Sequence, residues 1–258
     1  MVLWVIAAIA VGLLVKVGLD EQKRREVEQH ARSGSGLHDQ GLHEDALAEY
    51  SAAIGLDPKN PQLHTHRGRA LWALGRRSEA LDAYQRVAGL DAGSVAAHCD
   101  VADALRLMGH PRQALDSARR AVLLSSRSAR AHRIMGEALW DLDEGGKAID
   151  ALKASAGLHD TAEVRVRIAE VRCGQGNHVY ERNELDCAIA MEAGSADLHY
   201  RRARALLHVA ESSPKLREAS CRQAITDLEQ AIEIDARHEE AAEMLRRAKG
   251  MLEGGGGQ

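Results

Sequence analysis

The sequence has 258 residues, of which 45% are hydrophobic, yet aromatic residues contribute only 3% and phenylalanine is absent. This composition disfavours a β-sandwich or barrel, whose strands are rich in aromatic and β-branched residues, and favours a helical core of alanine and leucine. The 34 basic and 38 acidic residues give a net charge of −4. That balance excludes a strongly basic nucleic-acid-binding protein, and the apolar fraction excludes intrinsic disorder.

The first element expected along the chain is a hydrophobic helix over residues 1–19. No charged residue occurs from Val2 to Val15, and Lys16 is the one charge before residue 20. Nineteen helical residues span about 28 Å, close to the roughly 30 Å hydrocarbon core of a bilayer. Trp4 and Lys16 suit the two interfaces of such a span. The segment predicts a single transmembrane helix, with a buried partner helix of a soluble protein as the alternative.

A charged juxtamembrane helix is expected next, over residues 20–26. Lys16, Lys23, Arg24 and Arg25 all flank the C-terminal side of the hydrophobic segment. Positively charged flanks remain on the cytoplasmic side of a membrane. We therefore expect a single-pass membrane protein whose soluble domain is cytoplasmic.

From residue 27 onward the sequence repeats every 34 residues. A small residue, a large apolar residue, an alanine and a fourth apolar residue recur in the sets Gly34/Gly68/Ala102/Gly136, Leu37/Leu71/Leu105/Leu139, Ala46/Ala80/Ala114/Ala148 and Tyr50/Tyr84/Ala118/Leu152. Each period holds two amphipathic segments with a glycine between them, at Gly41, Gly75 and Gly109. Neither segment can bury its apolar face alone, so the pattern predicts helical hairpins that stack into one core.

This spacing resembles the tetratricopeptide repeat, whose signature positions match Gly34, Leu37, Ala46, Tyr50, Ala53 and Pro58. The resemblance implies an all-α, right-handed α-solenoid of about six helical hairpins after the transmembrane helix. The expected units are 27–60, 61–94, 95–128, 129–161, 162–195 and 196–236, then a capping helix at 237–252 and a flexible tail at 253–258.

Two units depart from the regular repeat. The fifth unit has Arg172 and Glu181 where leucine and alanine are expected. The sixth unit holds nine additional residues, and a bulge is expected at residues 211–214, which include a proline. Gly145 and Gly146 are expected in the turn between the two helices of the fourth unit.

Histidines recur at one repeat position, namely His30, His64, His98, His132 and His199. Stacked hairpins separate equivalent positions by at least about 8–10 Å, whereas zinc needs ligand nitrogens about 2.0–2.1 Å from one centre. These histidines are therefore expected to pack as structural side chains. Two local groups lack a recognised ligand motif: His64-Thr65-His66, and His38, Asp39, His43 and Glu44. We expect no metal and no cofactor.

No sequence motif for catalysis occurs. The chain lacks a P-loop, a nucleophile elbow and a zinc-protease motif, so we expect it not to be an enzyme. The cysteines form no CxxC pair and are expected to be reduced: Cys99, Cys173, Cys187 and Cys221.

The resemblance also implies that the first helix of each unit lines a binding groove. The residues expected there are Thr65, Arg69, Trp72, Cys99, Asp103, Arg106, Arg133, Glu137, Trp140, Tyr200, Arg204 and Leu207. Exposed tryptophan beside arginine is typical of binding anchors, and the excess of arginine favours an acidic peptide. The alternative is that Trp72 and Trp140 cap hairpin junctions. The carboxylate clamp of chaperone-binding repeats is not matched, because Ala31 and Ser35 replace its first lysine and asparagine.

These features together predict a membrane-tethered scaffold or adaptor. Its groove would bind partner peptides or subunits during assembly or recruitment of a membrane-associated complex, and it would bind no nucleic acid. A permanent structural subunit of a membrane machine is the first alternative, and an anchored import or targeting receptor is the second.

Overall fold

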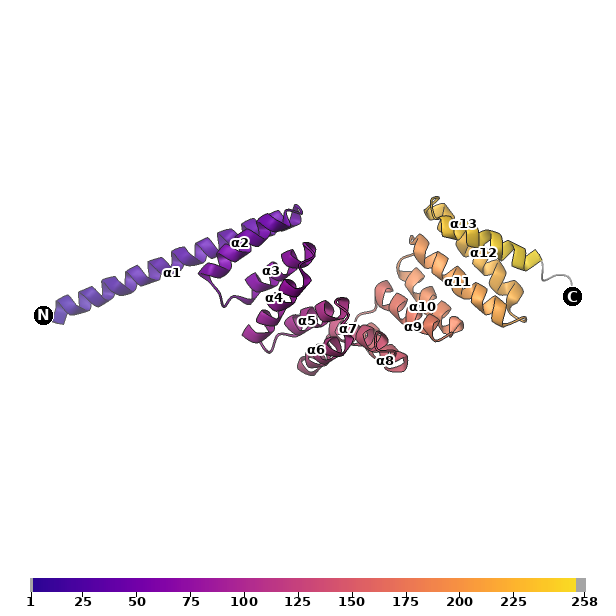
Figure 1. Ribbon diagram of the computed structural model, residues 1–258, viewed down its shortest axis with the longest axis horizontal. Coiled ribbons are helices and arrows are strands. Elements are labelled where there is room, and N and C mark those ends of the chain that lie inside the picture. The colour runs from indigo at the N-terminus through magenta and orange to yellow at the C-terminus, as the bar shows by residue number, and fades with distance from the viewer. Residues whose placement is uncertain (1, 254–258) are drawn as a thin grey trace. The chain divides into compact units, whose positions relative to one another are not determined.

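The computed structural model describes the backbone of residues 2–253 and the side chains of residues 18–253, and every regular element in this range is an α-helix (Figure 1). The helices are α1 (Val2–Asp39), α2 (His43–Leu56), α3 (Pro61–Ala73), α4 (Arg77–Leu90), α5 (Val95–Leu107), α6 (Pro111–Leu124), α7 (Ala129–Trp140), α8 (Gly145–Leu158), α9 (Ala162–Gly174), α10 (His178–Met191), α11 (Ala196–Ser212), α12 (Arg217–Ile234) and α13 (Glu239–Glu253). The expected juxtamembrane segment, residues 20–26, lies within α1.

The helices divide into two compact units, residues 1–126 with α1–α6 and residues 127–258 with α7–α13. In the first unit α1 packs on α2, α3 on α4, and α5 on α6. In the second unit α7 packs on α8, α9 on α10, and α11 on α12, with α13 against α12 (Figure 1). Each unit is thus a stack of helical hairpins.

Side chains of complementary size join the two helices of a hairpin. Helices of 12–14 residues are marginal alone, so this packing supplies most of their stability. Gly68 lies so close to Tyr84 that an added Cβ would stand 2.6 Å from the ring, and a Cβ on Gly136 would stand 2.7 Å from Leu152. In the third hairpin Ala102 and Ala118 occupy these two positions, and both are fully buried.

In the first five hairpins the turn between the two helices has one residue in the left-handed region. Gly41, Gly75, Gly109 and Gly176 supply it, with φ between 71° and 81°. In the fourth hairpin Asp143 takes this conformation with φ 60°, and Gly145 and Gly146 are the first residues of α8. The expectation that these two glycines form the turn was wrong. The repeat register places residue 143 at the turn, and aspartate tolerates the left-handed region better than most residues.

Three of the five recurring histidines contact the loop that precedes their hairpin, whereas His30 lies 2.6 Å from a Glu49 carboxylate oxygen. The Nε2–H of His64, His98 and His199 donates to the carbonyl oxygen of the residue six positions earlier, at 2.9, 3.1 and 3.0 Å. A polar side chain also caps the first helix of most hairpins: Asn60, Ser94, Ser128, Thr161 and Ser195. These histidines therefore satisfy loop carbonyls, which is a structural use of the imidazole.

The sixth hairpin accommodates its additional residues by lengthening both helices. Helix α11 has 17 residues and α12 has 18, so Glu211 and Ser212 belong to α11 and the turn spans residues 213–216. The irregular segment expected at residues 211–214 thus lies at residues 213–216. Helix α11 continues that far because Val209 and Ala210 are buried and extend its apolar face.

Within the part of the chain whose side chains are described, no helix is long and apolar enough to cross a bilayer. The predicted anchor at residues 1–19 lies outside that part, apart from Gly18 and Leu19.

Candidate partner-binding face

In the first unit the predicted groove residues lie on α3 and α5. Trp72 is half-buried and Arg69 is exposed. The Arg77 guanidinium lies 5.8 Å from the Trp72 ring centroid, a cation–π contact. Within residues 18–253 no carboxylate lies within ion-pair distance of Arg69. Burial lowers the pKa of His66, and the charge of Arg69 lowers it further. Arg69 and Trp72 together present a cationic and aromatic surface.

Side-chain length decides which predicted positions on α5 reach solvent. Cys99 is only 1% exposed and belongs to the core, whereas Asp103 and Arg106 are half-buried. A longer side chain at the same register, such as Arg133 on α7, extends past the core. The prediction that Cys99 lines a groove is therefore wrong.

In the second unit the predicted residues of α7 form ion pairs within the protein. Arg133 donates to Glu137 at 2.7 Å and lies 3.6 Å from Glu163. Glu137 is 4% exposed and also lies 3.5 Å from Arg167 on α9. The positive charge of Arg133 is therefore balanced inside the unit, and Glu137 is buried below the surface.

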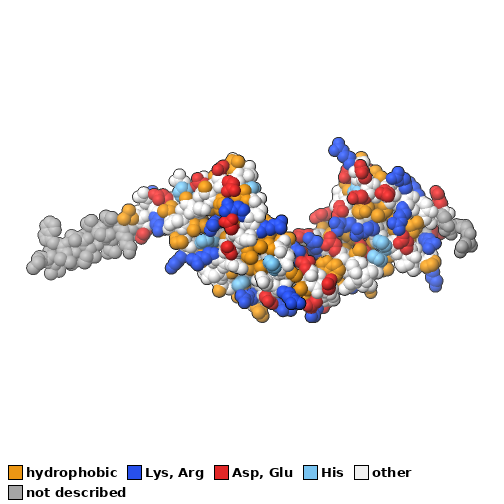
Figure 2. All heavy atoms as spheres, viewed as in Figure 1, with side chains coloured by type: hydrophobic (Ala, Val, Ile, Leu, Met, Phe, Trp, Pro, Cys, Tyr) orange, Lys and Arg blue, Asp and Glu red, His pale blue; other side chains and the backbone are white. Residues whose placement is uncertain are grey.

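The ion pairs continue along α9 and α11. Glu170 accepts from Arg167 at 2.7 Å and from Arg201 at 2.8 Å, and Arg204 lies 3.8 Å from Glu181. Figure 2 shows blue and red side chains side by side over the second unit. Arg133, Arg167, Arg201 and Arg204 of the second unit therefore lie near carboxylates of the same unit, whereas Arg69 of the first unit is exposed.

Trp140 differs from Trp72 although the two share a repeat position. A Cβ on Gly174 would overlap the Trp140 ring, and a Cβ on Gly145 would stand 3.5 Å from its Cζ3 atom. The indole thus lies against the start of α8 and the end of α9, as the junction-capping alternative proposes. Leu207 is 3% exposed and is a core residue, while half-buried Tyr200 packs on His238 with ring centroids 4.8 Å apart.

The sequence reasoning omitted the fifth hairpin from the candidate face. This hairpin is spaced by 33 residues, so Glu170 and Cys173 are the equivalents of Glu137 and Trp140. The signal was already in the sequence, since Arg172, Gly176 and Glu181 follow Leu139, Asp143 and Ala148 of the fourth hairpin by 33 residues. The same step leads from Glu137 and Trp140 to Glu170 and Cys173.

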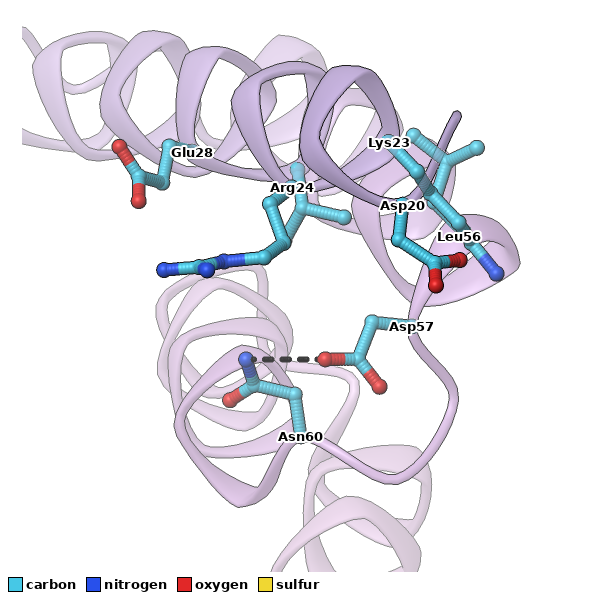
Figure 3. A pocket seen from close by; sticks show the side chains of 8 residues that line it. Asp20, Lys23, Arg24, Glu28, Leu56, Asp57 and Asn60 are labelled. Atoms are coloured by element: carbon cyan, nitrogen blue, oxygen red, sulfur yellow. Dashed lines mark hydrogen bonds between the residues drawn. The ribbon is translucent and has the colours of Figure 1, made fainter. Parts of the chain in front are cut away.

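A pocket of roughly 400 Å³ lies between α1 and the turn that joins α2 to α3 (Figure 3). Basic Lys23 and Arg24 line it together with acidic Asp20, Glu28 and Asp57. Asn60 donates a hydrogen bond of 3.4 Å to Asp57 across its floor. The mixture of both charges gives the pocket no preference for an anion or a cation.

Histidines of both local groups considered above contact another aromatic ring. His38 and His43 approach with their Nδ1 atoms 3.1 Å apart, and His66 stacks on Tyr50 with centroids 5.4 Å apart. In the part of the chain with described side chains, the one group of three potential metal ligands is Cys173, His178 and Glu181.

The four cysteines are free thiols and differ in access, which predicts an order of alkylation. Burial raises the pKa of the Cys173 thiol, and the Glu181 carboxylate raises it further. In metal-free buffer at neutral pH we expect iodoacetamide to modify exposed Cys187 first and Cys173 severalfold more slowly, and buried Cys99 and Cys221 only after unfolding. Peptide mass spectrometry over time measures this order.

A rise in pH populates the Cys173 thiolate and should accelerate its modification. Modification of Cys173 as fast as Cys187 at neutral pH would contradict the raised pKa.

Comparison with known protein families identifies the repeat. A model described as TPR repeat matches residues 34–75, and two models described as tetratricopeptide repeat match residues 61–93 and 100–163. None of the three describes a catalytic domain. The chain is a tetratricopeptide repeat protein. A comparison with curated proteins found no match to the sequence.

Solved structures share the fold. TTC0263, a thermophilic TPR protein of Thermus thermophilus, is 24% identical with a TM-score of 0.58 and covers 70% of this chain and 99% of its own. PilF of Pseudomonas aeruginosa is 15% identical with a TM-score of 0.65, covering 87% and 99%. YrrB, described as a TPR protein with an unusual peptide-binding site, is 16% identical with a TM-score of 0.56, covering 76% and 97%.

Proposed function

We propose that the protein is a membrane-tethered scaffold or adaptor whose first-helix face binds a segment of a partner protein. Stacked helical repeats use their extended face for binding, because each hairpin adds side chains at the same register. The fold it shares with YrrB, described as having a peptide-binding site, is consistent with this mode. The observation that carries the proposal is the surface formed by exposed Arg69 and half-buried Trp72 on α3.

The partner segment we propose is acidic. Arg69 can donate a bidentate pair of hydrogen bonds to a carboxylate, and Trp72 offers a broad apolar surface beside it. In the second unit, by contrast, Arg133 already pairs with Glu137 at 2.7 Å. We therefore place the principal contact on the first unit.

Residues 1–19 supply the tether in this proposal. The apolar run before Asp20 has the length of a bilayer core, and the basic residues that follow it favour a cytoplasmic side for the repeats. Tethering raises the concentration of the repeats near other membrane proteins and thereby strengthens a weak contact. Deletion of residues 1–19 should move the protein from the membrane fraction to the soluble fraction.

Affinity purification in mild detergent tests the binding role. The amount of partner recovered with the double variant Arg69→Glu, Trp72→Ala should be at least tenfold lower than with the unaltered protein, because the variant lacks both the positive charge and the aromatic side chain. Gln85→Ala on α4 is the matched control, since Gln85 is exposed on the second helix of the same hairpin. Equal recovery of partner with both variants would exclude this face.

The stoichiometry of the same purification separates the adaptor from its alternatives. An adaptor gives substoichiometric partners that salt removes, as expected for an exposed charged contact. A permanent structural subunit gives a salt-resistant complex of fixed stoichiometry, and a targeting receptor gives several unrelated clients.

A further inference from the structure

A cysteine, a histidine and a buried carboxylate converge at the turn between α9 and α10. Cys173 is in the last turn of α9, His178 is the first residue of α10, and Glu181 follows three positions later. One donor atom from each lies within 4.8 Å of the other two. The Nδ1 atom of His178 is 2.8 Å from a Glu181 carboxylate oxygen.

Glu181 is a charged residue at a position where the repeat core has a small apolar residue. The other hairpins have a fully buried alanine at this position (Ala46, Ala80, Ala114 and Ala148), whereas Glu181 is a carboxylate with 2% exposure. Burial of a carboxylate is costly unless a positive group compensates its charge. The hairpin would pack without this group, so its presence points to a cation.

Three side chains face the Glu181 carboxylate: the His178 imidazole, the Cys173 thiol, which hydrogen-bonds to it, and the Arg204 guanidinium, the one permanent cation among them. Besides His178, the Arg204 guanidinium of α11 approaches to 3.8 Å, which is longer than a hydrogen bond. The ring of His208, also on α11, stacks on His178 with centroids 4.5 Å apart and planes 18° apart. This stacking holds the His178 imidazole beside the carboxylate.

We propose that Cys173, His178 and Glu181 bind one divalent cation of the zinc class. Thiolate, imidazole and carboxylate are ligands that zinc combines, whereas magnesium and calcium require oxygen ligands. Three protein ligands leave the fourth tetrahedral position to water. Binding replaces the thiol proton of Cys173 by the metal and releases that proton to solvent. If the Nδ1 atom of His178 is the ligand, the proton that it donates to Glu181 moves to Nε2 or to solvent. Gly174 ends α9 and Gly176 lies in the turn before α10, which permits the small closure of the ligands onto the metal.

Arg204 is the competing cation at this site. When the metal binds, the guanidinium must give up its contact with Glu181 and is repelled by the new charge. Arg204→Met should therefore raise the affinity for the metal on the order of tenfold. If the cluster is only a structural ion pair, no saturable metal binding is expected in either protein, and Arg204→Met should instead lower the stability because the buried Glu181 carboxylate loses a counter-charge.

Titration of untagged, metal-stripped full-length protein with Co²⁺ tests the site. We expect saturation at one equivalent, with the near-ultraviolet band of a cobalt–thiolate bond and the visible bands of a tetrahedral ion, and displacement of both by Zn²⁺. Cys173→Ser and Glu181→Ala should abolish the bands. Glu181→Ala installs the alanine of the other hairpins, so the variant is expected to fold.

Cys187→Ser is the matched control, because Cys187 is exposed on the same helix as His178 but outside the cluster, and it should keep the bands. The absence of a saturable band, or a band that persists in both Cys173→Ser and Glu181→Ala, would overturn the proposal and show adventitious binding only.

Discussion

Replacement of Arg202 by methionine should lower the free energy of unfolding by about 3 kcal/mol, the largest effect we expect from a single charge. Arg202 on α11 donates two hydrogen bonds to Asp227 on α12, at 2.8 and 2.5 Å, and a third to Asp186 on α10 at 2.8 Å. Asp227 is 3% exposed. Without the guanidinium this buried carboxylate loses its main counter-charge, which is the most costly way to break an ion pair.

Urea unfolding measures the effect against a neighbouring arginine. Arg201 pairs with Asp197 and Glu170 but is more exposed, so Arg201→Met should cost less than about 1 kcal/mol. A second substitution, Asp227→Leu, should recover most of the loss in Arg202→Met, since a well-packed apolar residue needs no counter-charge. Similar losses for Arg201→Met and Arg202→Met would contradict the role of the buried pair.

Tyr84→Ala should cost about 3 kcal/mol, because it leaves a cavity between α3 and α4. The effect of Gly68→Ala should then depend on residue 84. With Tyr84 present, the added Cβ would stand 2.6 Å from the ring and should destabilise the hairpin. With alanine at residue 84, the same substitution fills part of the cavity and should stabilise the protein. The chain itself contains this combination as Ala102 and Ala118 in its third hairpin.

A double-mutant cycle measured by thermal or urea unfolding tests this change of sign. The control is Gly89→Ala on α4, where a Cβ would meet nothing within 4 Å and should stabilise by about 0.5–1 kcal/mol in either background. If Gly68→Ala changes the free energy of unfolding in the same direction with tyrosine and with alanine at residue 84, side-chain size complementarity does not govern the packing of the hairpin.

The repeat register predicts the fold because most hairpins pack a small residue of the first helix against a large residue of the second at the same two positions. The recurrence of Gly34, Gly68 and Gly136 opposite a bulky residue indicates where the two helices of a hairpin touch. The predictions from this register that were wrong concern single residues and not the arrangement of the helices. Asp143 was passed over as the turn residue because Gly145 and Gly146 are the residues that usually mark a turn.

The candidate face was harder to predict, because periodicity places a residue beside the core without showing what covers it. Trp72 and Trp140 share one register, yet only Trp140 meets a glycine, Gly174, on the next hairpin. The charge balance of the second unit likewise depends on Arg133 and Arg167 reaching Glu137 from two helices. Such contacts follow from side-chain conformations that spacing does not encode.

Site-specific photo-crosslinking tests the binding proposal most directly. A benzophenone amino acid replaces Trp72 in one full-length protein and Gln85 in another, and both are irradiated in native membranes. We predict a discrete crosslinked partner from position 72 that Arg69→Glu abolishes, and none from position 85 on α4 of the same hairpin. Equal crosslinking from the two positions, or a product from position 72 that Arg69→Glu leaves unchanged, would contradict binding on the first-helix face.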